Sequence, residues 1–128
     1  MKYSEIKTGQ TAELSHTITQ KDVYDFIVIT GDDNPVHTKG DCIVHGMLTA
    51  SFISTLIGTK LPGNGSVWTS QSLNFVRPVK IGDTITVKGE VHGKRDKNKT
   101  ITLLTDVSNQ NDEVVIFGIA SVIVNDNG

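Results

Sequence analysis

Apolar and polar residues follow two different spacings along this chain. In the first part, apolar residues recur every three or four positions, which is typical of amphipathic helices. From about residue 67 onward, valine, isoleucine, threonine and leucine predominate, and several segments alternate polar with apolar residues, as residues 84–88 do. The pattern predicts helices followed by a strand meander, and a length of 128 residues suits one domain, residues 1–128, of the α+β class.

Two helices are expected. Thr19, followed three residues later by Asp22, resembles a capping box, and Gly31 is well suited to end the apolar stretch that follows. The second helix should run from about Gly46 to Gly58 and be deeply buried, because its apolar residues lie around much of its circumference. Strands with one covered face should follow at residues 67–76, 83–94, 100–108 and 114–124, with hairpin turns at 96–98 and 109–112.

A carboxylate, a carboxamide and an imidazole lie close together just after the first predicted helix. Pro35 fixes its own φ angle and keeps Asn34 out of the helical region, so the chain turns here. Asp32 and His37 can then face one cavity and share a water molecule, whose protons they could accept and return. The alternative interpretation is that the Asp and Asn residues only cap and turn the chain, as they do in many loops.

Val44, His45 and Gly46 come directly before the second predicted helix. A glycine there lets a ligand approach the backbone, and the free N–H groups of the first turn favour a developing negative charge. The alternative is that Gly46 is an ordinary N-cap. We interpret His45 as a partly buried histidine that braces the turn, in preference to a catalytic role.

The chain resembles the MaoC-like, (R)-specific enoyl-CoA hydratase family in two linked motifs, Asp32-x-Asn34-Pro35-x-His37 and Val44-His45-Gly46-Met47-Leu48. Residues 70–79, 82–84 and 118–122 are also similar to that family, so the likeness spans nearly the whole chain. The resemblance implies the hot-dog fold, in which a long antiparallel sheet wraps around a central helix. It also implies a homodimer or higher homo-oligomer.

The resemblance further implies a reaction, the addition of water to a trans-2-enoyl thioester to give an (R)-3-hydroxyacyl product. In this interpretation Asp32 accepts the proton of the attacking water, and His37 positions the water and supplies a proton to the α-carbon. Asn34 orients the pair. The backbone N–H of Gly46 polarises the thioester carbonyl, onto which negative charge is pushed during the addition.

Three residues resemble positions on the pocket wall of that family: Ser66, Trp68 and Thr69. Trp68 and Thr69 are equally well explained as strand residues that pack on the helix. No cofactor is expected, because coenzyme A is part of the substrate. No metal is expected either, because four histidines and one cysteine show no closely spaced pattern of zinc ligands.

One departure from the family lies between His37 and Ile43, where this chain has only residues 38–42. Relatives usually carry a longer segment with a small helix. We expect either a true shortening, which would open one side of the acyl pocket, or a sequence that lacks residues of this segment. A five-residue bridge could also strain the spacing between Asp32, His37 and Gly46.

Charge argues against a protein that binds nucleic acid. Twelve basic and fourteen acidic side chains give a formal net charge of −2 without a long basic block, so nucleic acid is not an expected partner. The basic stretch at residues 94–99 reads as a solvated hairpin tip, with a contact to coenzyme A phosphates as the alternative. Cys42 is the single cysteine, and we interpret it as a small loop residue rather than a nucleophile.

No apolar run approaches the length of a membrane span, and the N-terminus lacks an export signal, so we expect a cytoplasmic protein without a membrane partner. The resemblance implies an enzyme, a hydro-lyase that acts on enoyl-CoA. Two alternatives remain open at this point. One is a hot-dog acyl-CoA thioesterase, and the other is a non-catalytic subunit that binds acyl thioesters.

Overall fold

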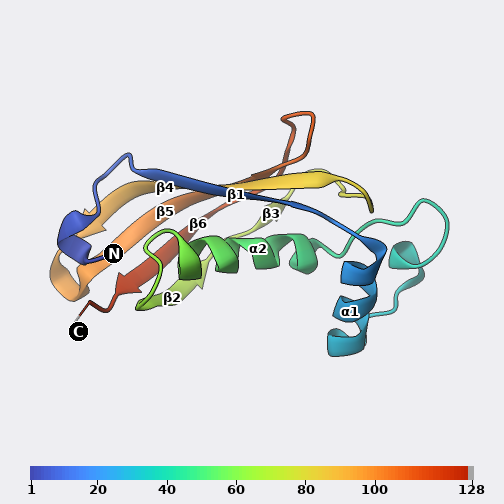
Figure 1. The fold of residues 1–128 in the computed structure, drawn as a ribbon, viewed down its shortest axis with the longest axis horizontal. Helices are drawn as coiled ribbons and strands as arrows, with labels where there is room; N and C mark the ends of the chain where they lie inside the picture. The colour runs from blue at the N-terminus through green and yellow to red at the C-terminus, as the bar shows by residue number, and fades with distance from the viewer. Residues whose placement is uncertain (127–128) are drawn as a thin grey trace.

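The computed structural model describes residues 1–126, which form one antiparallel sheet with a long helix against one face (Figure 1). The helices are α1 (Gln20–Thr30) and α2 (Gly46–Thr59), with short 3-10 turns η1 (Tyr3–Glu5), η2 (Pro35–His37) and η3 (Lys97–Lys99). The strands are β1 (Thr11–Thr17), β2 (Ser66–Gln71), β3 (Asn74–Phe75), β4 (Thr84–Arg95), β5 (Thr100–Ser108) and β6 (Val114–Val124).

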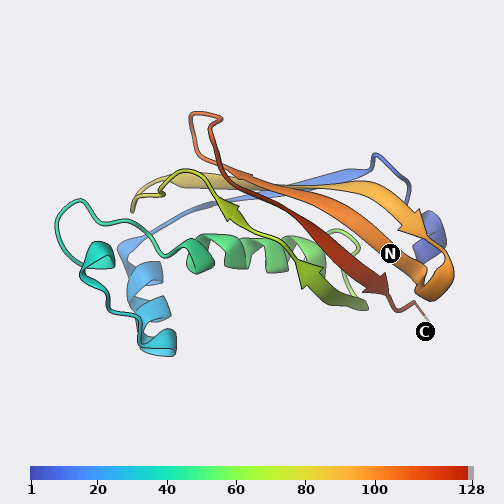
Figure 2. The same ribbon diagram turned by 180° about the vertical axis from the view of Figure 1, so that it is seen from behind.

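The strand order in the sheet is β1-β4-β5-β6-β2, and β3 also pairs with β6. Figures 1 and 2 show α2 running along the concave side of this sheet, while α1 hangs beyond one end of it. The core lies between α2 and the long strands, where Ile53 and Leu56 of the helix meet Val87 and Leu103 of the sheet, all with 0% of their surface exposed. This is the hot-dog fold that the family resemblance predicts.

Helix α1 has the boundaries that its sequence signals predict. The Thr19 side chain accepts a hydrogen bond from the N–H of Asp22 at 3.1 Å, and the Asp22 carboxylate accepts one from the N–H of Thr19 at 3.0 Å. Gly31 ends the helix with φ of 76°, a left-handed conformation. The predicted capping box and C-cap are therefore confirmed.

The predicted strand at residues 67–76 is divided into β2 and β3 by Ser72. Ser72 N–H donates to Ile119 O, and Ile119 N–H donates to the Ser72 hydroxyl oxygen, both at 2.9 Å. The Ser72 side chain thus replaces a backbone acceptor and interrupts the ladder. Gly118 permits this arrangement, because a Cβ at this position would lie only 1.8 Å from Ser72 O.

Two further features differ from the sequence expectation. Strand β1 was not predicted, and its alternation is weak because only Leu14 among its inward residues is a large hydrophobe. Helix α2 is not deeply buried all round. Its sheet-facing residues are buried, but Met47 is 56% exposed and Ser51 is exposed on the opposite side. A single chain has only one sheet face with which to cover this helix.

The basic stretch near residues 94–99 forms the end of the β4–β5 hairpin, as one of the two interpretations expects. Lys94 donates to Tyr3 O at 3.0 Å, and Lys99 pairs with Asp126 at 2.7 Å. Both lysines are thus engaged at the end of the molecule where the two termini lie (Figure 1). Among the described residues, no helix is both long and apolar enough to cross a bilayer.

Candidate active site

The turn after α1 carries three of the predicted site residues, Asp32, Asn34 and His37. Asp32 follows the helix end, and its Oδ1 accepts a hydrogen bond from Asn34 N–H at 3.3 Å. Asn34 Oδ1 accepts one from Val36 N–H at 3.2 Å, and Pro35 begins η2. His37 is the last residue of η2, one short turn after the carboxylate. Asn34 therefore acts in this structure as the residue that caps the turn.

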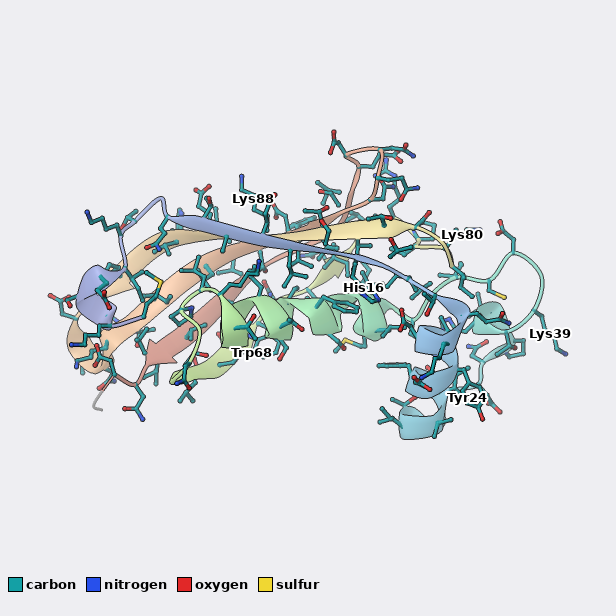
Figure 3. The ribbon with its side chains drawn as sticks, viewed as in Figure 1. His16, Tyr24, Lys39, Trp68, Lys80 and Lys88 are labelled. Carbon is teal, nitrogen blue, oxygen red and sulfur yellow. The ribbon has the colours of Figure 1, made fainter. Side chains whose placement is uncertain are left out.

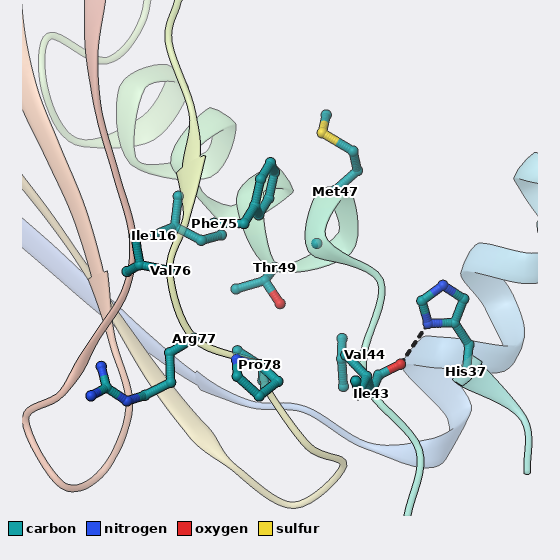
Figure 4. A pocket seen from close by; sticks show the side chains of 12 residues that line it. His37, Ile43, Val44, Met47, Thr49, Phe75, Val76, Arg77, Pro78 and Ile116 are labelled. Atoms are coloured by element: carbon teal, nitrogen blue, oxygen red, sulfur yellow. Dashed lines mark hydrogen bonds between the residues drawn. The ribbon is translucent and has the colours of Figure 1, made fainter.

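The His37 ring is held through one nitrogen. Its Nδ1 donates to Ile43 O at 2.5 Å, the dashed line in Figure 4. A carbonyl oxygen can only accept, so Nδ1 carries a proton and Nε2 is the nitrogen left for proton transfer. Ile43 N–H also donates to Val36 O at 2.9 Å. The backbone of Ile43 is thus bonded twice to the residues that precede the short loop 38–42.

The side chains of Asp32, His37 and His45 form one cluster, in which a carboxylate oxygen and one nitrogen from each ring lie within 4.8 Å of one another. Asp32 is exposed, His37 is partly buried and His45 is buried. One water molecule can bridge a carboxylate and an imidazole at this separation, because each hydrogen bond to it spans roughly 2.7–3.0 Å. The structure thus brings Asp32 and His37 to one space.

Gly46 begins α2, directly after the N-cap residue His45. The first N–H groups of a helix have no intrahelical partner, and the helix dipole adds positive potential where they point. The first bonded N–H of this turn is that of Leu48, which donates to His45 O at 3.0 Å. The Gly46 N–H lies ahead of that bonded turn, where it can meet the oxygen of a ligand.

A cavity of about 560 Å³ opens beside the start of α2 (Figure 4). Its walls are mostly apolar, and its lining residues are His37, Ile43, Val44, Gly46, Met47, Thr49, Phe75, Val76, Arg77, Pro78, Val79 and Ile116. Arg77 turns its guanidinium away from the cavity and pairs with Glu113 at 3.3 Å. The cavity therefore suits a hydrocarbon chain, and the imidazole and the helix start border the same space.

The family is decided by comparison with known proteins. The model of the MaoC like domain matches residues 2–113, which is most of the chain. This chain belongs to the MaoC-like family.

Several named relatives of this MaoC-like protein are enzymes. It is 41% identical to an (R)-specific enoyl-CoA hydratase of Rhodospirillum rubrum, covering 95% of this chain and 90% of the relative. It is 40% identical to a 3-hydroxybutyryl-CoA dehydratase of Methylorubrum extorquens, covering 95% of this chain and 83% of that protein. The unliganded R-hydratase PhaJ1 of Pseudomonas aeruginosa superposes with a TM-score of 0.91 at 38% identity, covering 97% of this chain and 85% of that chain.

The MaoC-like chain is shorter than its relatives within the matched region. The comparison with the Rhodospirillum rubrum hydratase runs over 131 positions, which exceeds the 128 residues of this chain. The short segment at residues 38–42 is consistent with this difference in length. It does not pull the site apart, because the two hydrogen bonds made by Ile43 close the loop and leave His37 and Gly46 on one cavity.

Three predicted wall residues of the MaoC-like site lie elsewhere in the single chain. Ser66 donates to Ile57 O near the end of α2, and Thr69 donates to Ser121 O at 3.0 Å. Trp68 is 41% exposed on the edge strand β2, well away from the end of α2 where the cavity opens (Figure 3). Within one chain these three residues do not line the cavity beside His37, and their substrate-binding role stays a prediction.

The Asp32, His37 and His45 cluster has residue types that can bind a metal ion, which the sequence spacing did not indicate. The geometry fits such a role poorly. One nitrogen of each ring is committed to a carbonyl oxygen, and the two rings are stacked 3.7 Å apart at 21°. The two remaining lone pairs therefore lie in nearly parallel planes and do not converge on one point, as ligands of a tetrahedral zinc ion do.

His16 of β1 contacts both helices. Its Nε2 lies 2.7 Å from Asp22 Oδ2 of α1, and its ring stacks on Phe52 of α2 with centroids 4.4 Å apart. Partial burial raises the pKa of Asp22, but hydrogen bonds with His16 and Thr19 outweigh it and bring the pKa below its usual value. An ionised Asp22 thus stabilises the first turn of α1, at the opposite end of the helix from Asp32.

Phe75 is a wall residue that sequence reasoning missed. It belongs to the two-residue strand β3, which exists only through pairing with β6. Because this pairing joins segments about forty residues apart in the chain, no local pattern around Phe75 could have indicated it.

Proposed function

We propose that this protein is a reversible (R)-specific enoyl-CoA hydratase, a hydro-lyase that converts trans-2-enoyl-CoA to (R)-3-hydroxyacyl-CoA. The observation that carries the proposal is the approach of the Asp32 carboxylate to the His37 imidazole, within 4.8 Å, beside an apolar cavity. The likeness to enzymes of this activity at about two fifths identity supports it.

The reaction needs one base and one acid. Asp32 accepts a proton from the bridging water as its oxygen forms a bond to the β-carbon of the enoyl group. The double bond shifts toward the thioester and leaves an enolate. The proton taken up by Asp32 then passes to Nε2 of His37, and their separation suits that transfer through water. His37 delivers this proton to the α-carbon, which restores both groups.

The thioester oxygen gains negative charge during the addition. The N–H of Gly46 and the start of α2 can stabilise that charge, because their dipoles are fixed before the reaction begins. This location also sets the direction of the substrate, with the carbonyl at the helix start and the double bond toward His37. The apolar cavity then takes the hydrocarbon part of the acyl group.

No cofactor takes part in this proposal, since coenzyme A enters as part of the substrate. Acid–base addition of water to a conjugated thioester does not require a Lewis acid. The stacked arrangement of the two histidines also favours proton transfer over metal binding. We accordingly expect the rate to be unchanged after treatment with a metal chelator.

We also propose that the enzyme acts in the cytoplasm.

A homodimer is part of the proposal. Strand β2 is at the edge of the sheet, so its outer backbone groups are free to pair with a second copy. Val67 and Trp68 on that strand are 49% and 41% exposed, so this edge offers apolar surface that a partner could cover. A second copy would also bring Ser66 and Thr69 near another chain, where their predicted substrate contacts become possible.

The test is an assay with trans-2-enoyl-CoA thioesters of increasing chain length. Loss of the conjugated absorbance, with (R)-3-hydroxyacyl-CoA identified by chiral chromatography, is the expected result. Release of free thiol without a hydroxyacyl product would identify a thioesterase instead. Saturable binding without any change in absorbance would identify a non-catalytic binding subunit.

A further inference from the structure

His45 touches more of the site than any role in the proposed reaction requires. It is only 3% exposed, although it precedes a helix start that opens on a cavity. Its side chain does not cap α2, even though it is the N-cap residue. Its ring instead contacts both residues of the proton-transfer pair, Asp32 and His37.

The first contact is with the main chain of Asp32. His45 Nε2 lies 2.8 Å from the carbonyl oxygen of Asp32. That oxygen can only accept, so Nε2 carries the proton and the tautomer of His45 is fixed. The bond crosses from the start of α2 to the loop after α1, and it holds a residue that is itself exposed.

The second contact is with the His37 ring. The two imidazoles are stacked with centroids 3.7 Å apart and planes at 21°. On another side the His45 ring packs against Phe26 of α1, with centroids 4.8 Å apart at 53°. The hydrogen bond to Ile43 O therefore restrains rotation of the His37 ring within its own plane, and the His45 ring packs against one face of it.

We infer that His45 is a positioning residue of the hydration reaction, one that fixes the Asp32 carboxylate and the His37 imidazole relative to each other and to Gly46. This inference rests on the proposed function. His45 adjoins Gly46 in the chain, donates to Asp32 and stacks on His37, so a single buried ring joins three parts of the site. It touches no reacting atom and acts through its neighbours.

Two variants separate the two contacts. His45→Phe keeps an aromatic ring on His37 but has no donor for Asp32 O, whereas His45→Gln keeps an N–H donor and loses the stacked ring. Each variant is expected to lower kcat by about 10- to 100-fold with KM changed less than about twofold, because small displacements of reacting groups slow the chemistry without weakening binding. Thermal unfolding identifies which variants are folded, and the folded ones decide the outcome.

The matched control is His16→Phe. His16 also stacks on an aromatic ring and bonds to an aspartate, but its partners are Phe52 and Asp22. This variant should lose some stability and keep kcat within about twofold, since His16 touches neither Asp32 nor His37. A loss as large as that of His45→Phe would show a general effect of removing a histidine packed on an aromatic ring, and would overturn the inference.

A double-mutant cycle distinguishes positioning from a merely structural role. When His37→Ala has already removed the acid, adding His45→Phe should reduce the residual rate less than about twofold, because residues that act as one unit are not additive. Equal losses in both backgrounds would overturn the inference. An unchanged kcat in both folded His45 variants would overturn it too.

A readout without substrate keeps the two proposals apart. Nitrogen NMR of the histidine rings in the wild type should show His45 protonated on Nε2 and His37 on Nδ1. The opposite tautomer for His45 would overturn the inference whatever the activity. If these tautomers are found and the protein still hydrates no enoyl-CoA, the proposed function fails while the arrangement of the three side chains stands.

Discussion

Gly46 lies directly beside the ring of Phe75, and a Cβ at position 46 would come within 2.7 Å of it. The helix start and the cavity wall are therefore fitted to each other at a point where only a hydrogen atom has room. Phe75 is 52% exposed, so its ring has space to rotate outward when it is pushed.

Gly46→Ala should therefore fold and fail in activity. The added methyl group displaces the Phe75 ring or the thioester from the helix start, and kcat/KM for crotonyl-CoA should fall by about 10- to 100-fold, a scale similar to the loss of one oxyanion donor. Thermal unfolding should change little. The double variant Gly46→Ala with Phe75→Ala restores the room, and recovery of activity would attribute the loss to this contact; no recovery would contradict it.

Removal of either proton-transfer group should slow the reaction without unfolding the protein. Asp32→Asn and His37→Ala are each expected to lower turnover by about 10²- to 10⁴-fold, the usual scale for a general acid or base. Both residues are at least partly exposed, so their side chains add little to the core. Asp33→Asn, one residue along the same exposed turn, is the matched control, and a near-normal rate in either site variant would refute the roles given to them.

Asp22 should make stability depend on pH in the acid range. Because its pKa is lower in the folded protein than in the unfolded chain, its stabilisation is complete above the unfolded value and is lost as pH falls through the folded one. Asp22→Asn should reduce the free energy of unfolding at pH 7 by about 1 kcal/mol, the scale of a helix cap. Urea titrations of both proteins should converge below about pH 4, near the reference pKa of aspartate; a constant difference down to pH 2 would contradict this.

Light scattering should give the mass of two chains for the wild type. Trp68→Glu puts a charge on the exposed face of the edge strand β2 and should shift the equilibrium toward monomer. Lys88→Glu, exposed on the interior strand β4, is the control and should remain a dimer. A strict monomer in the wild type would remove the second chain from the proposed site.

Local signals in the sequence predict well those parts of the fold that are held by local contacts. Thr19, Asp22 and Gly31 mark the ends of α1 because the bonds involved join residues at most four positions apart. The division between β2 and β3 could not be predicted in this way. It depends on hydrogen bonds between Ser72 and Ile119, which are 47 residues apart.

The candidate site shows the same contrast. Asp32 and His37 could be placed together from a turn of six residues, since Pro35 limits where the chain can go. The sequence also predicts that His45 braces its turn, but its contacts with Asp32 and His37 could not be predicted, because they depend on how the start of α2 meets the loop after α1. In the proposed dimer, the substrate contacts of Ser66, Trp68 and Thr69 arise at the interface between two chains, and such an interface leaves no local pattern in the sequence.

The two hydrogen bonds of Ile43, one to Val36 and one to His37, close residues 38–42 into a loop that projects outward from its own base. Residues inserted at Gly40, which is exposed at the tip, would extend away from these two hydrogen bonds and leave the His37 imidazole in place. The protein thus offers a natural insertion point a few residues from its chemistry, where a reporter peptide or a fluorophore attachment site could sense ligand arrival without disturbing it.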